Sequence, residues 1–235
     1  MPTLYIVATP IGNLEDITLR ALKVLKEVDV VIAEDTRRTR KLLAHYQITK
    51  TILPLHERSS SRDQGKVVSL LGDSTLACVV DSGTPGISDP GASFIAAVLK
   101  AYGKNARIVP IPGPSALTAL TSIVGQPMRR FLFFGFLPKK KGRNKALGEI
   151  AASLYPVIIF ESPHRIIKTL LELQRFGKFS LVVGRELTKT FETVYQGAPE
   201  EVLEDLGKGT IKGEFTVCIM KNEVRARTKN HTGNS

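Results

Sequence analysis

The chain has 235 residues, 43% of them hydrophobic and 23% charged, with a formal net charge of +11 from 33 basic and 22 acidic side chains. This length and composition are typical of a globular protein with one large or two modest domains. No apolar run approaches the roughly 20 residues of a membrane-spanning helix. The first residues lack the basic region and apolar stretch of a secretory signal, so we expect a cytoplasmic protein. The positive charge makes nucleic acid the first partner to consider, although a solvated basic surface would give the same excess.

The cysteines and histidines give no sign of a metal centre. Cys78 and Cys218 both lie inside apolar runs and are expected to pack in the interior. The four histidines are scattered, and no cluster of cysteine and histidine has the spacing of metal ligands. We therefore expect no metal site.

The first half of the chain alternates short apolar runs with segments of helical periodicity. The apolar runs predict strands at 4–7, 30–33, 51–55, 76–80 and 107–111. Between and after them, helices are expected at 14–28, 36–43, within 59–71, at 90–102 and at 116–124. Asp16 and Asp89 are the expected N-caps of the first and fourth of these helices, with Pro90 at the first helical position. Five strands alternating with helices predict a mostly parallel sheet that is covered on both faces.

Four loops that follow these strands carry candidate chemistry. The loop at 80–91 contains three glycines and two prolines, and the others span 10–12, 34–37 and 112–115. Glycine allows backbone amides to approach a ligand closely, and right-handed crossovers bring such loops to one edge of the sheet, where ligands bind. A surface turn would explain any one of these loops. Four at one edge favour a ligand site.

The second half shows a different pattern. Strands are predicted at 131–136, 157–160, 181–183, 192–195 and 215–220, and helices at 164–176 and 199–206. The short gap from 185 to 191 suggests an antiparallel pair of strands. We therefore predict an α/β protein with an N-terminal domain at 1–116, a C-terminal mixed α/β domain at 117–222 and a polar, disordered tail at 223–235.

Several common sites are excluded by pattern. The first turn lacks Gly-x-Gly-x-x-Gly, no Gly-Lys-Ser/Thr follows a glycine loop, and no Gly-x-Ser-x-Gly elbow occurs. What remains is an edge that is rich in backbone amides and carbonyls and has few strong nucleophiles. Such an edge suits a neutral or cationic small ligand that is held by main chain.

Seven motifs in order carry a family resemblance. They are LYIVATPIGNLEDIT at 4–18, AEDTR at 33–37, DSGTP at 81–85, PGPS at 112–115, GFLP at 135–138, ESPHR at 161–165 and RELTKT at 185–190. Together they resemble the tetrapyrrole-methylase superfamily, and within it most closely the branch that methylates a ribose of small-subunit ribosomal RNA. The resemblance runs from residue 4 to about residue 220.

This resemblance implies two α/β domains with S-adenosylmethionine in the cleft between them, and a homodimer. The implied reaction is methyl transfer to the 2′-hydroxyl of a cytidine in the decoding region of 16S rRNA. One alternative is C-methylation of a tetrapyrrole, against which the basic charge and the residues 186–189 weigh. Another is a non-catalytic RNA-binding factor with a degenerate pocket. The positions that match the family's cofactor contacts are Pro10, Ile11, Gly12, Asp81, Ser82, Gly83, Thr84, Ile87, Ser115, Ala116, Phe160, Glu161 and Leu187.

The acceptor hydroxyl is a poor nucleophile near neutral pH, so a general base or a cation beside the developing alkoxide would help. We hypothesise that two carboxylates and two cations surround the acceptor: Asp35, Arg37, Glu186 and Lys189. A carboxylate or the lysine would aid deprotonation, and the arginine would hold phosphate. Ion pairs between the domains are the structural alternative.

A basic run follows the aromatic strand of the second half. It is expected to contact RNA phosphates, which would make binding depend steeply on salt. A solvated charge run is the alternative. The candidate RNA-binding residues are Lys139, Lys140, Lys141, Arg143 and Lys145 of this run, with His164 and Arg165 at the start of a helix, where a structural capping role is the alternative.

Overall fold

The computed structural model describes residues 1–55 and 61–222. Its first sheet is entirely parallel, with the strand order β3-β2-β4-β1-β5, and this confirms the predicted sheet. The strands are β1 (Thr3–Val7), β2 (Val30–Ala33), β3 (Thr51–Pro54), β4 (Leu76–Val79) and β5 (Arg107–Ile111). Each lies within two residues of its predicted bounds.

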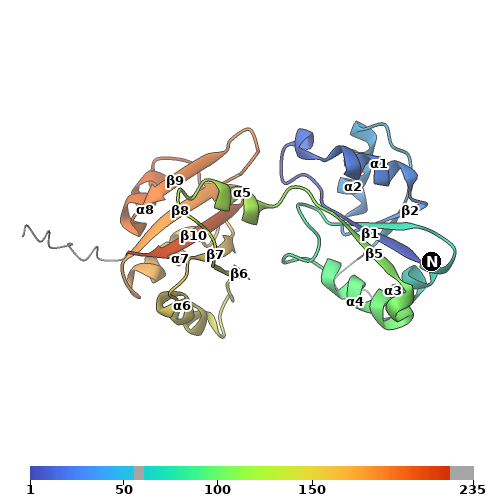
Figure 1. The fold of residues 1–235 in the computed structure, drawn as a ribbon. Coiled ribbons are helices and arrows are strands. Elements are labelled where there is room, and N and C mark those ends of the chain that lie inside the picture. The colour runs from blue at the N-terminus through green and yellow to red at the C-terminus, as the bar shows by residue number, and fades with distance from the viewer. Residues whose placement is uncertain (56–60, 223–235) are drawn as a thin grey trace, which may run out of the picture.

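Helices cover both faces of this sheet (Figure 1). Side chains alternate along each strand, so neighbours such as Val31 and Ile32 face opposite cores. Val31 packs in the core under α1 (Leu19–Glu27) and α2 (Thr36–His45). Ile32 packs with residues of α3 (Ser61–Ser69) and α4 (Gly91–Tyr102). Both faces of β2 are therefore buried, which explains its continuous apolar sequence.

Two predicted helix starts are corrected. Asp16 does not cap α1: it ends a short 3-10 turn, η1 (Leu14–Asp16), and the hydroxyl of Thr18 accepts the cap hydrogen bond from the amide of Ala21 at 3.1 Å. Asp89 does accept from the amide of Gly91 at 2.7 Å, but α4 begins at Gly91, so Pro90 is its N-cap residue. Of the predicted segment 59–71, residues 59 and 60 lie outside the described part of the chain.

The second sheet is mixed, with the order β6-β7-β10-β8-β9. Only β6 and β7 pair in parallel, and the remaining neighbours are antiparallel, including the predicted pair β8 and β9. The strands are β6 (Leu132–Phe136), β7 (Val157–Glu161), β8 (Phe179–Arg185), β9 (Thr193–Gly197) and β10 (Phe215–Lys221).

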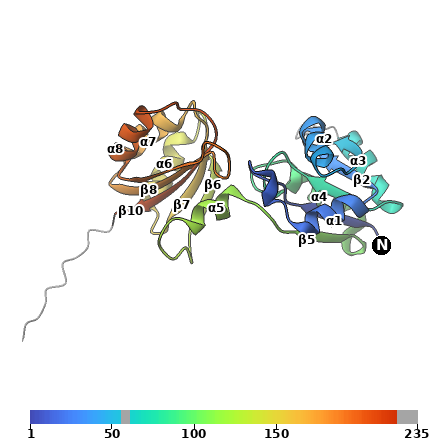
Figure 2. The same cartoon turned by 90° about the horizontal axis from the view of Figure 1, so that it is seen from above.

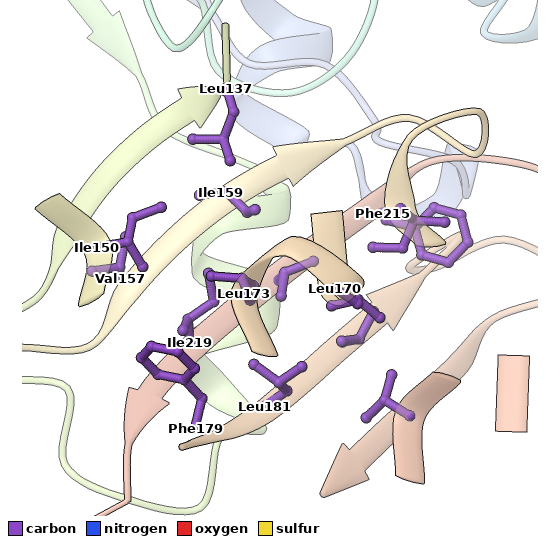
Figure 3. Packing of buried hydrophobic residues seen from close by; sticks show 14 of the residues in the cluster. Leu137, Ile150, Val157, Ile159, Leu170, Leu173, Phe179, Leu181, Phe215 and Ile219 are labelled. Atoms are coloured by element: carbon purple, nitrogen blue, oxygen red, sulfur yellow. The ribbon is translucent and has the colours of Figure 1, made fainter. Parts of the chain in front are cut away.

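One face of the second sheet is covered by α6 (Arg143–Ala152), α7 (Ile166–Gln174) and α8 (Pro199–Gly207). Figure 3 shows Leu170 and Leu173 of α7 lying against the side chains of the sheet. α6 was not predicted, because its first residues belong to the basic run and a glycine, Gly148, interrupts its middle. Its buried face, which includes Leu147 and Ile150, is the signal that could have revealed it.

The opposite face of the second sheet meets α5 (Ala116–Ser122) and the first half of the chain. Ile11, from the turn after β1, packs in one cluster with Leu120 of α5 and with Ile158, Val182 and Cys218 of the sheet. Figures 1 and 2 show the chain crossing from one sheet to the other between β5 and α5. The predicted domain boundary after residue 116 falls beside this crossing and stays a prediction. The predicted tail at 223–235 lies outside the described residues.

Both cysteines lie in the interior, as predicted. Cys78 is buried in β4 and Cys218 in β10, and burial raises the pKa of each thiol to about 12. Neither thiol is therefore ionised near neutral pH. In the described ranges, no helix combines the length and apolarity that crossing a membrane requires.

Candidate active site

A cavity of about 380 Å³ lies where the two halves meet, and residues of both line it. The first half contributes the loop after β4, Glu34 after β2 and Ile11 after β1. The second half contributes Phe136 at the end of β6 and the end of β7. The cavity thus lies at the carboxyl ends of the parallel strands, which is the edge predicted from the four loops.

Most positions predicted to bind the cofactor lie on this cavity wall. Those that do are Ile11, Asp81, Ser82, Gly83, Thr84, Ile87, Ser115, Ala116, Phe160 and Glu161. Three do not line it. Pro10 lines a neighbouring hollow, Gly12 contacts Lys189, and Leu187 is buried in the core that Ile11 shares.

The cavity wall also includes residues that the sequence analysis did not select: Glu34, Ser88, Asp89, Phe136, Ser162, Pro163, Glu214, Phe215 and Thr216. Glu34 could have been found, since it follows a buried parallel strand directly. Residues 214–216 could not, because they begin an antiparallel strand and reach the site only through the pairing of Phe215 with Glu161.

The loop after β4 is held in shape by its own side chains and by the first turn. The carboxylate of Asp89 accepts hydrogen bonds from the amides of Gly86, Ile87 and Gly91 at 2.7 to 2.9 Å. Gly83, at a φ of +81°, exchanges two backbone hydrogen bonds with Thr9. A residue with a side chain would be strained there. The backbone of this loop is therefore fixed beside the cavity.

The charge on the cavity wall is one-sided. Among the described residues that line it there are five carboxylates, Glu34, Asp81, Asp89, Glu161 and Glu214, and no lysine, arginine or histidine. Arg38, Lys189 and Arg165 pair with three of these carboxylates from outside the lining. Glu34 and Asp89 therefore carry the negative charge that no ion pair among the described residues offsets, and this charge favours a cationic ligand over one that carries phosphates. The charge distribution agrees with the ligand class predicted from the sequence.

Glu34 differs from the other four carboxylates. Asp81, Glu161 and Glu214 each pair with a cation, and Asp89 accepts backbone amides. Glu34 accepts from the amide of Asp81 at 3.2 Å and makes no ion pair with any described residue. Burial, followed by the charges of Asp81 and Asp89, raises the pKa of Glu34 above its usual value. Its carboxylate is thus the one most in need of a positive ligand.

Lys189 forms a cluster with two glutamates at the cavity wall. Its Nζ lies 2.8 Å from Oε1 of Glu186 and 3.0 Å from Oε2 of Glu214. Burial acts to lower the pKa of Lys189, but hydrogen bonds to Glu186 and Glu214 outweigh it and the pKa is raised. Lys189 is therefore a fixed cation near neutral pH and not a general base.

The loop that carries Lys189 is strained and is seated on the first half. Glu186 and Thr188 have positive φ values of 51° and 68°, a conformation that costs free energy in residues with side chains. The hydroxyl of Thr188 accepts from the amide of Asn13 at 3.2 Å. The aliphatic part of Lys189 covers Gly12 so closely that a Cβ at residue 12 would overlap its Cγ. The turn after β1 thus fixes the position of Lys189.

Asp35 and Arg37 do not line the cavity. Asp35 caps α2 by accepting from the amide of Arg37 at 2.8 Å, and its carboxylate pairs with the guanidinium of Arg37 at 2.9 Å. The hydrogen bonds from the Arg37 side chain and amide hold the pKa of Asp35 well below its usual range. In this structure Asp35 is thus a helix cap paired with Arg37 outside the cavity, and its lowered pKa does not favour a role as general base. Neither this pair nor the Lys189 cluster is an ion pair between the two halves.

The predicted RNA-binding residues divide into two groups. Lys139, Lys140, Lys141, Lys145 and His164 are exposed. The other two, Arg143 and Arg165, are held inside the second half.

The prediction for Arg143 is wrong in this structure, because α6 turns its side chain inward. Arg143 is only 5% exposed, and its guanidinium contacts Glu172 and Thr169 at 2.7 Å each. Arg165 pairs with Glu161 at 2.7 Å, and Thr169 donates to the same carboxylate. These residues form a network that supports the cavity wall at Glu161.

Residues 3–203 match the family model of tetrapyrrole (corrin/porphyrin) methylases. The match covers most of the chain, including every residue of its first half that lines the cavity. The chain belongs to this family. Curated relatives of this chain, among them one from Thermotoga maritima and one from Halalkalibacterium halodurans, have the name "Ribosomal RNA small subunit methyltransferase I". The one from Thermotoga maritima is 40% identical over 225 residues, 95% of this chain and 100% of the relative. The one from Halalkalibacterium halodurans is 41% identical over 223 residues, 94% of this chain and 76% of the relative.

Two of the solved structures that this chain resembles share its fold. A diphthine synthase superposes with a TM-score of 0.71 at 14% identity, over 93% of this chain and 90% of that one. A uroporphyrin-III C-methyl transferase from Thermus thermophilus, complexed with S-adenyl homocysteine, superposes with a TM-score of 0.63 at 19% identity, over 92% of this chain and 96% of that one. Both likenesses establish the two-sheet fold.

Proposed function

We propose that this tetrapyrrole methylase uses S-adenosylmethionine to methylate small-subunit ribosomal RNA, and that its target is the ribose 2′-oxygen of the cytidine at nucleotide 1402 of 16S rRNA. The observation that carries the proposal is a cavity whose described lining has five carboxylates and no cationic side chain, in a chain about 40% identical to proteins named for rRNA methylation. The proposal includes a homodimer in the cytoplasm, as the family resemblance implies.

The cavity residues fit S-adenosylmethionine. Its volume of about 380 Å³ lies in the range of small-molecule sites. The sulfonium and amino groups of this cofactor are positive, which matches the carboxylate wall and Glu34, whose carboxylate makes no ion pair with any residue that the structure describes. Ser82, Gly83 and Thr84 offer backbone groups, and Phe160 offers an apolar surface. When bound, the cofactor supplies an electrophilic methyl group.

The chain's own residues would position and activate the acceptor. Lys189 places a permanent positive charge beside the cavity wall, where it would stabilise negative charge that develops on the ribose oxygen. Glu186 and Glu214 hold the ammonium in place, so no reorganisation is needed during the reaction. Correct orientation of the two substrates contributes on the order of 7–11 kcal/mol in well-aligned cases. Arg37, which is exposed beside Asp35, remains a candidate phosphate contact.

Transfer of labelled methyl from S-adenosylmethionine to small ribosomal subunits that lack this modification tests the function. We expect label on the ribose of the cytidine at nucleotide 1402. Label on another nucleotide would overturn the target, and label on uroporphyrinogen alone would overturn the substrate class. Cofactor binding without transfer to any acceptor would favour a non-catalytic RNA-binding factor. Light scattering of the purified protein tests the homodimer.

Replacement of Glu34 by glutamine is expected to weaken the binding of S-adenosylmethionine and to remove part of the pH dependence of that binding. The pKa of Glu34 is raised, so this carboxyl takes up a proton at a higher pH than an ordinary glutamate does. Lowering the pH through that window neutralises the carboxylate and should weaken binding of a cation. Calorimetric titrations with S-adenosylmethionine between pH 4 and pH 8 would measure this, with the exposed Glu15→Gln as the control. An unchanged pH profile in E34Q would contradict the assignment.

Replacement of Lys139, Lys140 and Lys141 by glutamine is expected to reduce the salt dependence of RNA binding. Three lost phosphate contacts would lower the slope of log affinity against log salt by about 2. Filter binding to small subunits at several salt concentrations would measure the slope. A triple variant of exposed lysines in the first half, at Lys23, Lys100 and Lys104, removes the same charge and is the control. Equal slopes in the two variants would show that the run at 139–141 is a solvated surface.

A further inference from the structure

Helix α2 presents a strongly basic face beside the cavity. Four of its residues, Arg37, Arg38, Arg40 and Lys41, are exposed cations, and its sequence TRRTRKLLAH contains no acidic residue. The two N-terminal arginines are partly neutralised, Arg37 by Asp35 at 2.9 Å and Arg38 by Asp81 at 3.5 Å. Arg40 and Lys41 make no ion pair within the described part of the chain. Their charges are therefore available to a partner.

A series of hollows connects this face with the cavity. A hollow of about 230 Å³ lies between the first turn and α2, and it shares Asp81 with the main cavity. A second hollow, of about 580 Å³, runs along α2. It is lined by four cations, Arg37, Arg38, Arg40 and Lys41, together with Ala44 and with Asp35, whose carboxylate pairs with Arg37. Arg38 and Lys41 belong to both hollows. A surface depression thus leads from the cavity wall at Asp81 along the basic face.

We propose that this face of α2 binds the phosphates of single-stranded RNA next to the nucleotide whose ribose enters the cavity. The proposal rests on the proposed function and extends it along α2, from Arg37, already a candidate phosphate contact, to Arg38, Arg40 and Lys41. The cavity wall is acidic and repels phosphates, whereas the adjoining depression has cations along its length. An RNA strand could therefore place one ribose at the cavity only if the phosphates on either side of that ribose lie outside the cavity, on a basic surface.

The proposed order of contacts follows from the ion pairs. Asp35 and Asp81 neutralise the end of α2 that is closest to the cavity. Phosphates should therefore be bound most strongly farther along the helix, by Arg40 and Lys41. The planar guanidinium of arginine can donate two hydrogen bonds to one phosphate, and lysine adds a compact charge. Single strands are the RNA form that fits a narrow path of this kind and leaves a ribose free to enter the site.

The test compares two double variants that remove the same charge from exposed positions. Arg40→Gln with Lys41→Gln alters α2, and Lys100→Gln with Lys104→Gln alters α4 and the turn after it, on the opposite face of the first sheet. Affinity for small ribosomal subunits is measured at several salt concentrations, and affinity for S-adenosylmethionine is measured in parallel. We expect the α2 variant to lose about 1.4 from the slope of log affinity against log salt, at about 0.7 per phosphate of a single strand. The control variant and both cofactor affinities should remain unchanged.

Arg40→Lys with Lys41→Arg keeps both charges and should keep the slope, which separates a phosphate contact from a folding defect. If the wild-type protein methylates ribosomal RNA and the two glutamine variants have equal slopes, the inference is overturned while the proposed function stands. If the wild-type protein does not methylate ribosomal RNA, the proposed function fails. The variants are then compared on a 15-nucleotide single-stranded RNA: a lower slope for the α2 variant alone supports the binding surface, and equal slopes overturn it.

Discussion

Replacement of Lys189 by methionine is expected to lower the rate of methyl transfer by about 10²- to 10³-fold, the usual effect of losing one electrostatic group at a reacting oxygen. The affinity for S-adenosylmethionine should change little, because Lys189 is not among the residues that line the cavity proposed for the cofactor. Single-turnover rates at saturating cofactor and RNA would measure the chemical step, and calorimetry would measure cofactor binding.

Lys189→Arg is the matched control, since it keeps the positive charge between Glu186 and Glu214 and should retain part of the rate. Because the pKa of Lys189 is raised, we expect no loss of activity from its deprotonation near neutral pH. A methionine variant with the wild-type rate would remove Lys189 from the mechanism. An equal loss of rate and of cofactor affinity would indicate a structural role.

Replacement of Arg143 by alanine is expected to destabilise the protein by about 3–5 kcal/mol, the usual cost of removing one partner of a buried ion pair. The substitution removes the guanidinium that lies 2.7 Å from Glu172, which is then left with only the more distant ammonium of Lys168 at 3.8 Å, and it removes a donor to Thr169. Chemical denaturation followed by circular dichroism would measure the change in the free energy of unfolding.

Lys145 provides the control for Arg143, because it lies on the same helix and its ammonium is exposed, at 3.9 Å from Glu149. Lys145→Ala should cost less than about 0.5 kcal/mol, as is usual for exposed pairs. Suppose instead that R143A is as stable as wild type, and that its affinity for RNA falls less steeply with salt. That result would support the prediction from the sequence that Arg143 contacts RNA phosphates.

The elements that were predicted best are the strands that are buried on both faces, because burial on both faces gives them a short, continuous apolar sequence. β4 is a short apolar run that is buried on both sides, and the pattern at 76–80 located it to within one residue. Within the basic run at 139–145, the four lysines are exposed and Arg143 is buried, because charge in the sequence does not reveal which way a helical side chain points. α6 has an inward-facing arginine at its first residue, and contacts with α7 and with the carbonyl of Pro138 satisfy its guanidinium.

The candidate site was predictable where glycine-rich loops follow parallel strands, as at Ile11 and at 81–84. It was not predictable where residues arrive from an antiparallel strand, as at 214–216, because strand register is a property of the folded sheet. The chemical roles also depended on partners. Asp35 and Lys189 were equivalent candidates in the sequence, but one is tied to Arg37 at the end of a helix and the other is held at the cavity wall.

The contact between Gly12 and Lys189 joins two positions that are distant in the chain. Any side chain at residue 12 would push the lysine away from its glutamates, although it would leave the sequence of the second half intact. In a genetic screen, inactive alleles at codon 12 should therefore resemble those at codon 189 and retain cofactor binding. Compensating changes should arise in the loop that carries the lysine and not in the first strand.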